Sequence, residues 1–415
     1  MPCPNRLRAA LGGALLATCS SLLHAQAPIP EDAPPEEDAP LGIVRGPVTF
    51  LPGLALEQRW DSNIWESADQ EEDSWVSTVT PTLAARIETA ASGWEFGYQG
   101  KGARYETSSD DDYFDHQARG RGILKLGQRQ TLELSGGYYA THEDRGTGLT
   151  EGISATTLQL LLNEPDTYAL TDAGIKYTLG STGSRGTVVA EAGYLDRNYT
   201  NHDARTQFFD YEETRGGLTF LWRVLPKTSV LLQATANEIS YAKDRPQEPT
   251  RDSAVLRYLA GLTWEATAKT TGTLKFGYQQ KDFDAANRKD FDSPAWEAEV
   301  RWSPRTYSHI DIKTRRYDQE TNFGGDFIDA KEYSVAWTHD WSRKWVSELT
   351  LSRVAQAYQE LDRDQDLTQA RLALRYQMRR WLGWELSWAH RNRSSNLDPL
   401  EFDRNQLMLG LKVAL

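Results

Sequence analysis

The feature that most constrains this chain is a period of two in its hydrophobic pattern. From about residue 51 to residue 415, stretches of roughly 10 to 15 residues alternate apolar and polar side chains and then end at a turn. In the last stretch, five aliphatic residues share one face: Leu407, Leu409, Leu411, Val413 and Leu415. Because an α-helix repeats every 3.6 residues, these stretches are predicted to be β-strands with two unlike faces.

The connections between the stretches alternate in length. Short connections occur at 225–228, 267–270, 303–306, 342–344 and 378–380. Long, acidic connections occur at 67–74, 108–112, 243–251, 284–292, 318–329, 360–366 and 394–401. Short turns on one rim and long loops on the other are typical of a bacterial outer-membrane barrel, whereas a soluble sandwich or propeller has no reason to segregate them. Counting from Leu54 gives about eighteen strands, so we expect an all-β, transmembrane antiparallel barrel over residues 51–415.

Composition supports this class of protein and excludes two others. The formal net charge of −13 argues against a nucleic-acid binder, which carries a basic surface to neutralise phosphates. A mean hydropathy of −0.61 excludes a bundle of apolar membrane helices. Many of the 14 Trp residues lie near strand ends, where the aromatic belts of membrane barrels occur. The alternative, aromatic residues in the core of a soluble sandwich, explains this position less well.

The first 25 residues are interpreted as a cleaved signal peptide. Arg6 and Arg8 precede a largely apolar run, and Leu23-His24-Ala25 resembles a signal-peptidase site. Two alternatives are a lipoprotein signal ending at Cys19 and an uncleaved anchor, for which the run is short. Both cysteines lie inside residues 1–25, so the mature chain has no disulfide. Residues 26–50 are Pro-rich and acidic, and we expect an extended periplasmic segment there.

The alternation also assigns many basic residues to the lumen. The faces opposite the apolar ones carry more Arg and Lys than Asp and Glu, although the whole chain is acidic. The arginines expected to line the pore are Arg86, Arg119, Arg121, Arg223, Arg257, Arg301, Arg315, Arg371, Arg375, Arg391, Arg393 and Arg404. Rings of such residues select anions in pores, so one hypothesis is an anion path. The alternative is that these charges pair across neighbouring strands and brace a wide barrel.

Motifs of catalysis and metal binding are missing from the sequence. There is no Gly-x-Ser-x-Gly elbow, no His-Glu-x-x-His helix and no phosphate-binding Gly loop, so no enzyme activity, metal or cofactor is expected. The acidic run 110–112 lacks the spacing of a calcium loop and is interpreted as a solvated loop tip. Residues 145–167 fit no strand and are predicted to be a long loop, with the apolar run 158–162 unexplained.

Several short motifs resemble the Putative beta-barrel porin 2 family. They are Trp60-Asp61-Ser62-Asn63-Ile64, Thr80-Pro81, Arg104-Tyr105 with residues 112–116, and the segments 222–228, 261–272 and 402–405. The segment 261–272 is the most specific of them. The resemblance implies an outer-membrane barrel associated with export of exopolysaccharide or capsule, working with a periplasmic polysaccharide-export protein. It implies no catalytic residues.

Together, these observations lead to the expectation of a channel in the Gram-negative outer membrane that exports a polysaccharide, with an anionic polymer favoured by the basic wall. Its partners would be outer-membrane lipid, the polysaccharide and a periplasmic export protein, with no nucleic acid. Tyr139, Tyr199 and Tyr317 could stack on sugar rings. Two alternatives are a general porin for small solutes and a surface enzyme or adhesin anchored by the barrel.

Overall fold

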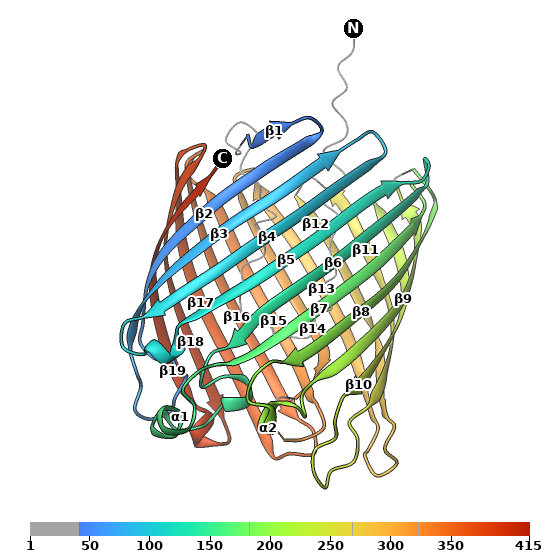
Figure 1. The fold of residues 1–415 in the computed structure, drawn as a ribbon. Coiled ribbons are helices and arrows are strands. Elements are labelled where there is room, and N and C mark those ends of the chain that lie inside the picture. The colour runs from blue at the N-terminus through green and yellow to red at the C-terminus, as the bar shows by residue number, and fades with distance from the viewer. Residues whose placement is uncertain (1–40, 182, 268, 322–323) are drawn as a thin grey trace.

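The computed structural model describes residues 41–181, 183–267, 269–321 and 324–415, which form one antiparallel barrel (Figure 1). The expected signal peptide, residues 1–25, and most of the segment 26–50 lie outside the described residues. The described chain begins with the short strand β1 (Ile43–Arg45), which pairs with the start of β2 through Ile43↔Phe50 and Arg45↔Val48.

Strands β2 to β19 follow each other around the barrel in chain order, so each strand pairs with its sequence neighbours. Their bounds are β2 (Val48–Asp61), β3 (Ser74–Glu88), β4 (Ser92–Tyr105), β5 (Tyr113–Lys125), β6 (Gln130–Glu143), β7 (Asp166–Leu179), β8 (Gly186–Tyr199), β9 (Tyr211–Leu225), β10 (Thr228–Tyr241), β11 (Ser253–Thr267), β12 (Thr270–Phe283), β13 (Phe291–Arg305), β14 (Ser308–Gln319), β15 (Ile328–Asp340), β16 (Trp345–Tyr358), β17 (Arg363–Arg379), β18 (Leu382–Ser395) and β19 (Phe402–Ala414). Neighbouring strands joined by short loops need no crossover, which is the simplest way to connect antiparallel strands.

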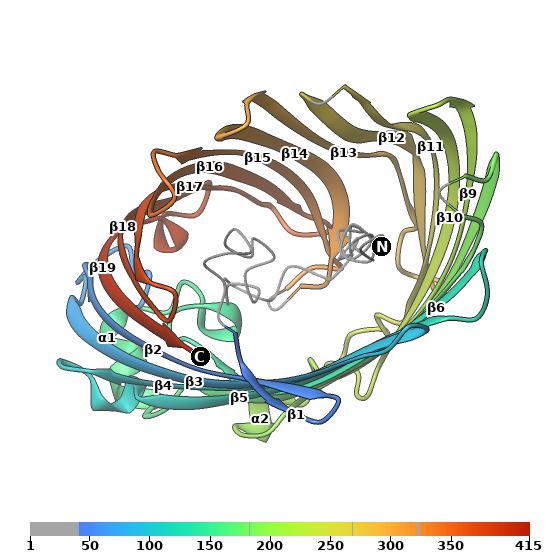
Figure 2. The same cartoon turned by 90° about the horizontal axis from the view of Figure 1, so that it is seen from above.

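The last strand closes the sheet on the first. β19 pairs with β2 from Gln406↔Asp61 to Ala414↔Gly53, and Figure 2 shows the resulting ring of strands from above. In the described part of the chain the sheet has 19 strands, of which all but β1 belong to the ring, and the predicted count of eighteen is confirmed. Closure leaves no sheet edge in the ring, which a lipid bilayer requires because it offers no hydrogen-bond partners to backbone groups.

The two faces of each strand differ as the sequence predicts. On β9, Leu218 and Phe220 point outward and are exposed, while Arg215 and Thr219 point inward and are partly buried. Outward tryptophans gather near the ends of strands joined by short turns, as at Trp222. Arg353 is an exception to this alternation, because it lies among the outward apolar side chains of β16. The structure accounts for this residue, because Arg353 binds Asp366 on β17 with both its Nε and Nη2.

The short and long connections lie at opposite ends of the barrel, which we call the turn rim and the loop rim (Figure 1). Among the described residues, the loop rim carries two helices, α1 (Ala155–Leu161) and α2 (Asp203–Thr206), and 3-10 turns at Ser109–Asp111, Gly148–Thr150 and Asp398–Leu400. None of the helices in the described residues is long and apolar enough to cross a membrane.

Residues 145–167 lie almost entirely in the long connection between β6 and β7, as expected, and helix α1 within it explains the apolar run that the sequence left unassigned. Ser154 caps the helix by accepting a hydrogen bond from the Thr157 amide. Leu158 is fully buried, whereas Leu160 is exposed. The run therefore belongs to an amphipathic helix of seven residues, about two turns, which is too short to give a clear helical period in the sequence.

We expect Leu218→Arg to destabilise the barrel and Thr219→Arg to be tolerated. An arginine at the middle of the outward face must enter hydrocarbon and costs about 2–4 kcal/mol, while the adjacent inward position lies on the polar face. Urea titration of each variant in phospholipid vesicles would measure the free energy of unfolding. An equal loss for both variants would contradict the assignment of the two faces.

Candidate functional site

The loops of the loop rim fold inward and share an apolar core with the inner wall. Trp65 and Ile64, from the loop between β2 and β3, pack with Leu158 of α1. They contact Val76 on β3 and Tyr105 on β4, whose side chains point into the barrel. Each of these five residues is buried. Two long loops that are distant in sequence thus form one packed unit against the wall.

A buried arginine ties this unit to a third loop. Arg145 donates to both carboxylate oxygens of Asp111, at 2.7 Å each, and to the backbone carbonyl of Leu162 at 2.6 Å. Asp111 also accepts a hydrogen bond of 2.9 Å from the indole of Trp65. A bidentate pair of this kind orients both partners, so loops 62–73, 106–112 and 144–165 are held in one arrangement.

The close approach of two of these loops requires glycine at position 146. Gly146 has a φ of +84°, in the left-handed region. A Cβ added there would lie 1.7 Å from the carbonyl oxygen of Trp65. Any other residue would push the loops 62–73 and 144–165 apart.

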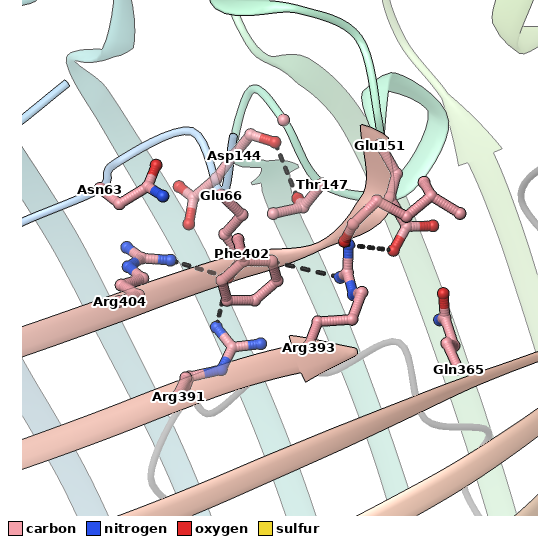
Figure 3. Close-up of polar contacts among 12 residues, drawn as sticks. Asn63, Glu66, Asp144, Thr147, Glu151, Gln365, Arg391, Arg393, Phe402 and Arg404 are labelled. Atoms are coloured by element: carbon pink, nitrogen blue, oxygen red, sulfur yellow. Dashed lines mark hydrogen bonds and ion pairs between the residues drawn. The ribbon is translucent and has the colours of Figure 1, made fainter. Parts of the chain in front are cut away.

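Four arginines form a continuous set on the inner face of β17, β18 and β19, and we call them the arginine stripe: Arg363, Arg391, Arg393 and Arg404. Arg391 and Arg404 stand directly opposite each other on β18 and β19. Like charges in this position repel and destabilise a sheet unless an anion lies between them. The structure places the side chain of Glu66 there (Figure 3).

Glu66 is the central anion of the stripe. Its carboxylate accepts hydrogen bonds from Arg391 at 2.5 Å, Arg404 at 2.9 Å and Arg393 at 3.4 Å. Only 2% of the residue is exposed, so these are buried ion pairs. Loop 62–73 is therefore attached to the far end of the chain by charge as well as by apolar contact.

A second carboxylate reaches the stripe from loop 144–165. Glu151 pairs with Arg393 at 2.7 Å (Figure 3) and with Arg363 at 2.6 Å. This loop starts at the end of β6, so it extends from there to the ends of β17 and β18. Gly152 follows, and a Cβ there would lie 2.6 Å from Leu400 in the loop between β18 and β19. Loops from separate parts of the ring thus meet inside the loop rim.

The seam where β2 meets β19 joins the first and the last of the family-like motifs. Asp61 accepts hydrogen bonds from Arg404 at 2.9 and 2.7 Å and from Gln406 at 2.7 Å. Asn63 donates to the carbonyl of Asp403 at 3.2 Å. The polar residues at these two positions therefore hold the barrel closed at its loop rim.

Another cluster lies across the rim, between β10, β12 and the loop after β14. Glu320 accepts from Lys281 at 2.7 Å and from the Tyr241 hydroxyl at 2.5 Å. Burial alone would raise the pKa of the Glu320 carboxyl, but these two partners outweigh it and hold that pKa below its ordinary value. Nearby, burial and the charge of Arg251 lower the pKa of Arg245 to about 10.

The arginines expected to line the pore point inward, and most of them bind carboxylates. Ion pairs are formed by Arg86, Arg121, Arg257, Arg301, Arg315, Arg371, Arg375, Arg391, Arg393 and Arg404. Arg119 is diagonal to Tyr139 on β6, and Arg223 lies near the turn rim. Arg371 and Arg375 share Glu348 and Glu385, a group without net charge. Pairing across strands, the alternative considered from the sequence, is thus a property of this wall.

The residues that organise the loop rim were mostly absent from the sequence prediction. It named Arg391, Arg393 and Arg404 but not their partners Glu66 and Glu151, nor Arg145 and Arg363. The available signal was the family-like motif 60–64, which directly precedes Glu66. Of the tyrosines suggested for sugar stacking, Tyr199 is buried and donates to Glu143, so it is unsuited to that role. Among the described residues, no group of His, Cys, Asp and Glu could hold a metal ion.

Comparison with known proteins identifies the family. The profile of Putative beta-barrel porin 2 matches residues 37–415, which is nearly the whole chain. The chain belongs to this family. It is therefore a porin-type barrel of the outer membrane, so the loop rim faces the outside of the cell and the turn rim the periplasm.

Solved structures with a similar barrel share little sequence with this chain. OpdK of Pseudomonas aeruginosa, solved with vanillate, is 12% identical, with 88% of this chain and 99% of that chain covered and a TM-score of 0.47. A BenF-like porin from Pseudomonas fluorescens Pf-5 is 10% identical, with coverages of 88% and 99% and a TM-score of 0.49. OccAB4 of Acinetobacter baumannii is 11% identical, with coverages of 88% and 98% and a TM-score of 0.46. No curated protein matched the sequence.

We expect Glu66→Ala to release loop 62–73 from the wall. The change leaves the buried Arg393 and Arg404 and the partly buried Arg391 without their shared carboxylate, and breaking a buried ion pair in this way costs about 3–5 kcal/mol. Hydrogen exchange would detect the release, because the amides of Ile64 and Ser67 are hydrogen-bonded within the docked loop. Glu95→Ala is the matched control, since its pair with Arg86 is well exposed and contributes less than about 1 kcal/mol. Unchanged exchange in Glu66→Ala would contradict the docking role of this residue.

Proposed function

We propose that the protein is a passive channel for small hydrophilic solutes. Membership of the family indicates a porin. The inward faces of the ring of strands are rich in charged and hydrogen-bonding side chains. A wall of this kind replaces part of the water shell of a polar solute and repels apolar molecules. A barrel of this size leaves space for water between its side chains, so transport needs neither a nucleotide nor a catalytic group.

The inward-folded loops carry this proposal and favour small solutes over a polymer. Loops 62–73 and 144–165 are attached inside the outer mouth by Trp65, Arg145 and the two glutamates on the arginine stripe. Every unit of a polysaccharide chain would have to pass between these loops and the wall. To widen that space, the loops would have to detach, which breaks several buried ion pairs. Small molecules need only the space that remains beside them. We therefore favour a general porin over the exopolysaccharide export that the family resemblance implied.

We expect proteoliposomes that contain the barrel to admit glucose and sucrose and to exclude dextran. The swelling rate measured by light scattering should fall steeply as the sugar grows, because the docked loops occupy part of the mouth. Liposomes without protein are the control for leakage. Equal swelling rates for all sugars, or passage of dextran, would favour the wide path that a polymer needs. No swelling with any sugar would contradict the channel itself.

We also propose that the inward arginines contribute to ion preference, although pairing reduces their effect. Where each guanidinium shares carboxylates, as at Arg371 and Arg375, the local charge is close to balanced. Anion preference in the native protein would then arise where basic groups exceed acidic ones, as at the arginine stripe. The wall of β17 and β18 is therefore a suitable place to change the balance of positive and negative charge.

We expect Arg371→Glu with Arg375→Glu to shift the channel toward cations. The double change gathers four carboxylates, including Glu348 and Glu385, on one part of the wall. The reversal potential in a planar bilayer under a salt gradient would measure the shift. Arg353→Glu is the control, because Arg353 faces outward and should leave the potential unchanged. The absence of a shift in the double variant would show that ions do not pass along this wall.

A further inference from the structure

We propose that the arginine stripe is a binding site for carboxylate-bearing small solutes, and that Glu66 and Glu151 occupy it while the loops are docked. This inference rests on the proposed function and adds the substrate class. Both glutamates come from loops, whereas the arginines belong to β17, β18 and β19. A carboxylate from solution can therefore replace a loop carboxylate without any change to the wall.

The first argument is the balance of charge. Five guanidinium groups face three carboxylates, because Arg59 also lies 3.5 Å from Asp61. The full set is Arg59, Arg363, Arg391, Arg393 and Arg404 with Asp61, Glu66 and Glu151. Of the other charges close by, Asp144 shares His142 with Asp115 and also faces Arg391 and Arg404, so it offsets part of this surplus. A mostly buried region with surplus positive charge attracts anions.

The second argument is the supply of donors. Nη2 of Arg391 and Nε of Arg393 are buried and donate to no acceptor within the described residues. Buried donors normally have a hydrogen-bond acceptor, so these two N–H groups could bind a further acceptor beside Glu66. The Phe402 ring lies 4.7 Å from the guanidinium of Arg393 and orients it toward the same space (Figure 3).

The third argument is the backbone of Glu66. This residue has a φ of +48°, in the left-handed region that residues with a Cβ rarely adopt. Such a conformation persists only where the surroundings enforce it, and here the three arginines hold the side chain. Displacement of Glu66 by a solute carboxylate would relax this strain, which lowers the free-energy cost of the exchange. Loop docking and solute binding are thus alternatives at one site.

The test measures the swelling rates of proteoliposomes in D-glucuronate and in glucose. These two solutes differ mainly by a carboxylate. We expect Glu66→Gln to raise the ratio of glucuronate to glucose permeation by about tenfold, because the tethered competitor loses its charge. Adding Arg391→Gln to this variant should return the ratio toward the wild-type value. Glu332→Gln is the matched control, since it breaks another Arg pair on the wall, with Arg315, outside the stripe.

The outcomes separate this inference from the proposed function. If both sugars permeate and the ratio stays constant in Glu66→Gln, the carboxylate site is wrong while the channel stands. If neither sugar permeates through any variant, the proposed function fails first. Heat-dependent migration on a denaturing gel shows that each variant is folded. A variant that fails this check is replaced by Glu66→Asp, whose shorter side chain should raise the ratio less than Glu66→Gln does.

Discussion

The rest of the structure depends on the pairing of β19 with β2. In hydrocarbon an unpaired backbone group costs several kcal/mol, so a sheet can cross a bilayer only when it has no edge. Here the ring closes through Gln406↔Asp61 and the pairs that follow, and Arg404 and Asp61 add a buried ion pair at the loop rim. Closure gives every strand one face toward lipid and one toward the lumen, and this separation determines where charge can lie.

Charged side chains on the inner faces have two roles that follow from this arrangement. Along the wall, pairs such as Arg301 with Asp311 connect adjacent strands and keep the lumen polar. At the loop rim, the arginines exceed the acids that their own strands supply, and loop residues provide the missing carboxylates. The loops therefore fold inward because the wall attracts Glu66 and Glu151 and because Trp65 and Leu158 need an apolar surface to pack on.

The fold was predictable from sequence, and the site only in part. A period of two and alternating turn lengths are local signals, so strand number, strand faces and the rims were all visible. The contacts of Glu66 with Arg391 and Arg404 join residues more than 300 positions apart, and no local pattern pairs them. Helix α1 was missed because its seven residues are fewer than the window in which a helical period can be recognised. The arginines themselves were found, since each occupies an inward position in its strand.

The central claim is that a water-filled path remains beside the docked loops. Single-channel current through the purified barrel in a planar bilayer tests this most directly. The account expects stable, discrete steps of current at low voltage, since the loops are held by buried contacts and leave the path open. A barrel that inserts in folded form but passes no current would contradict it, because the loops would then close the mouth completely.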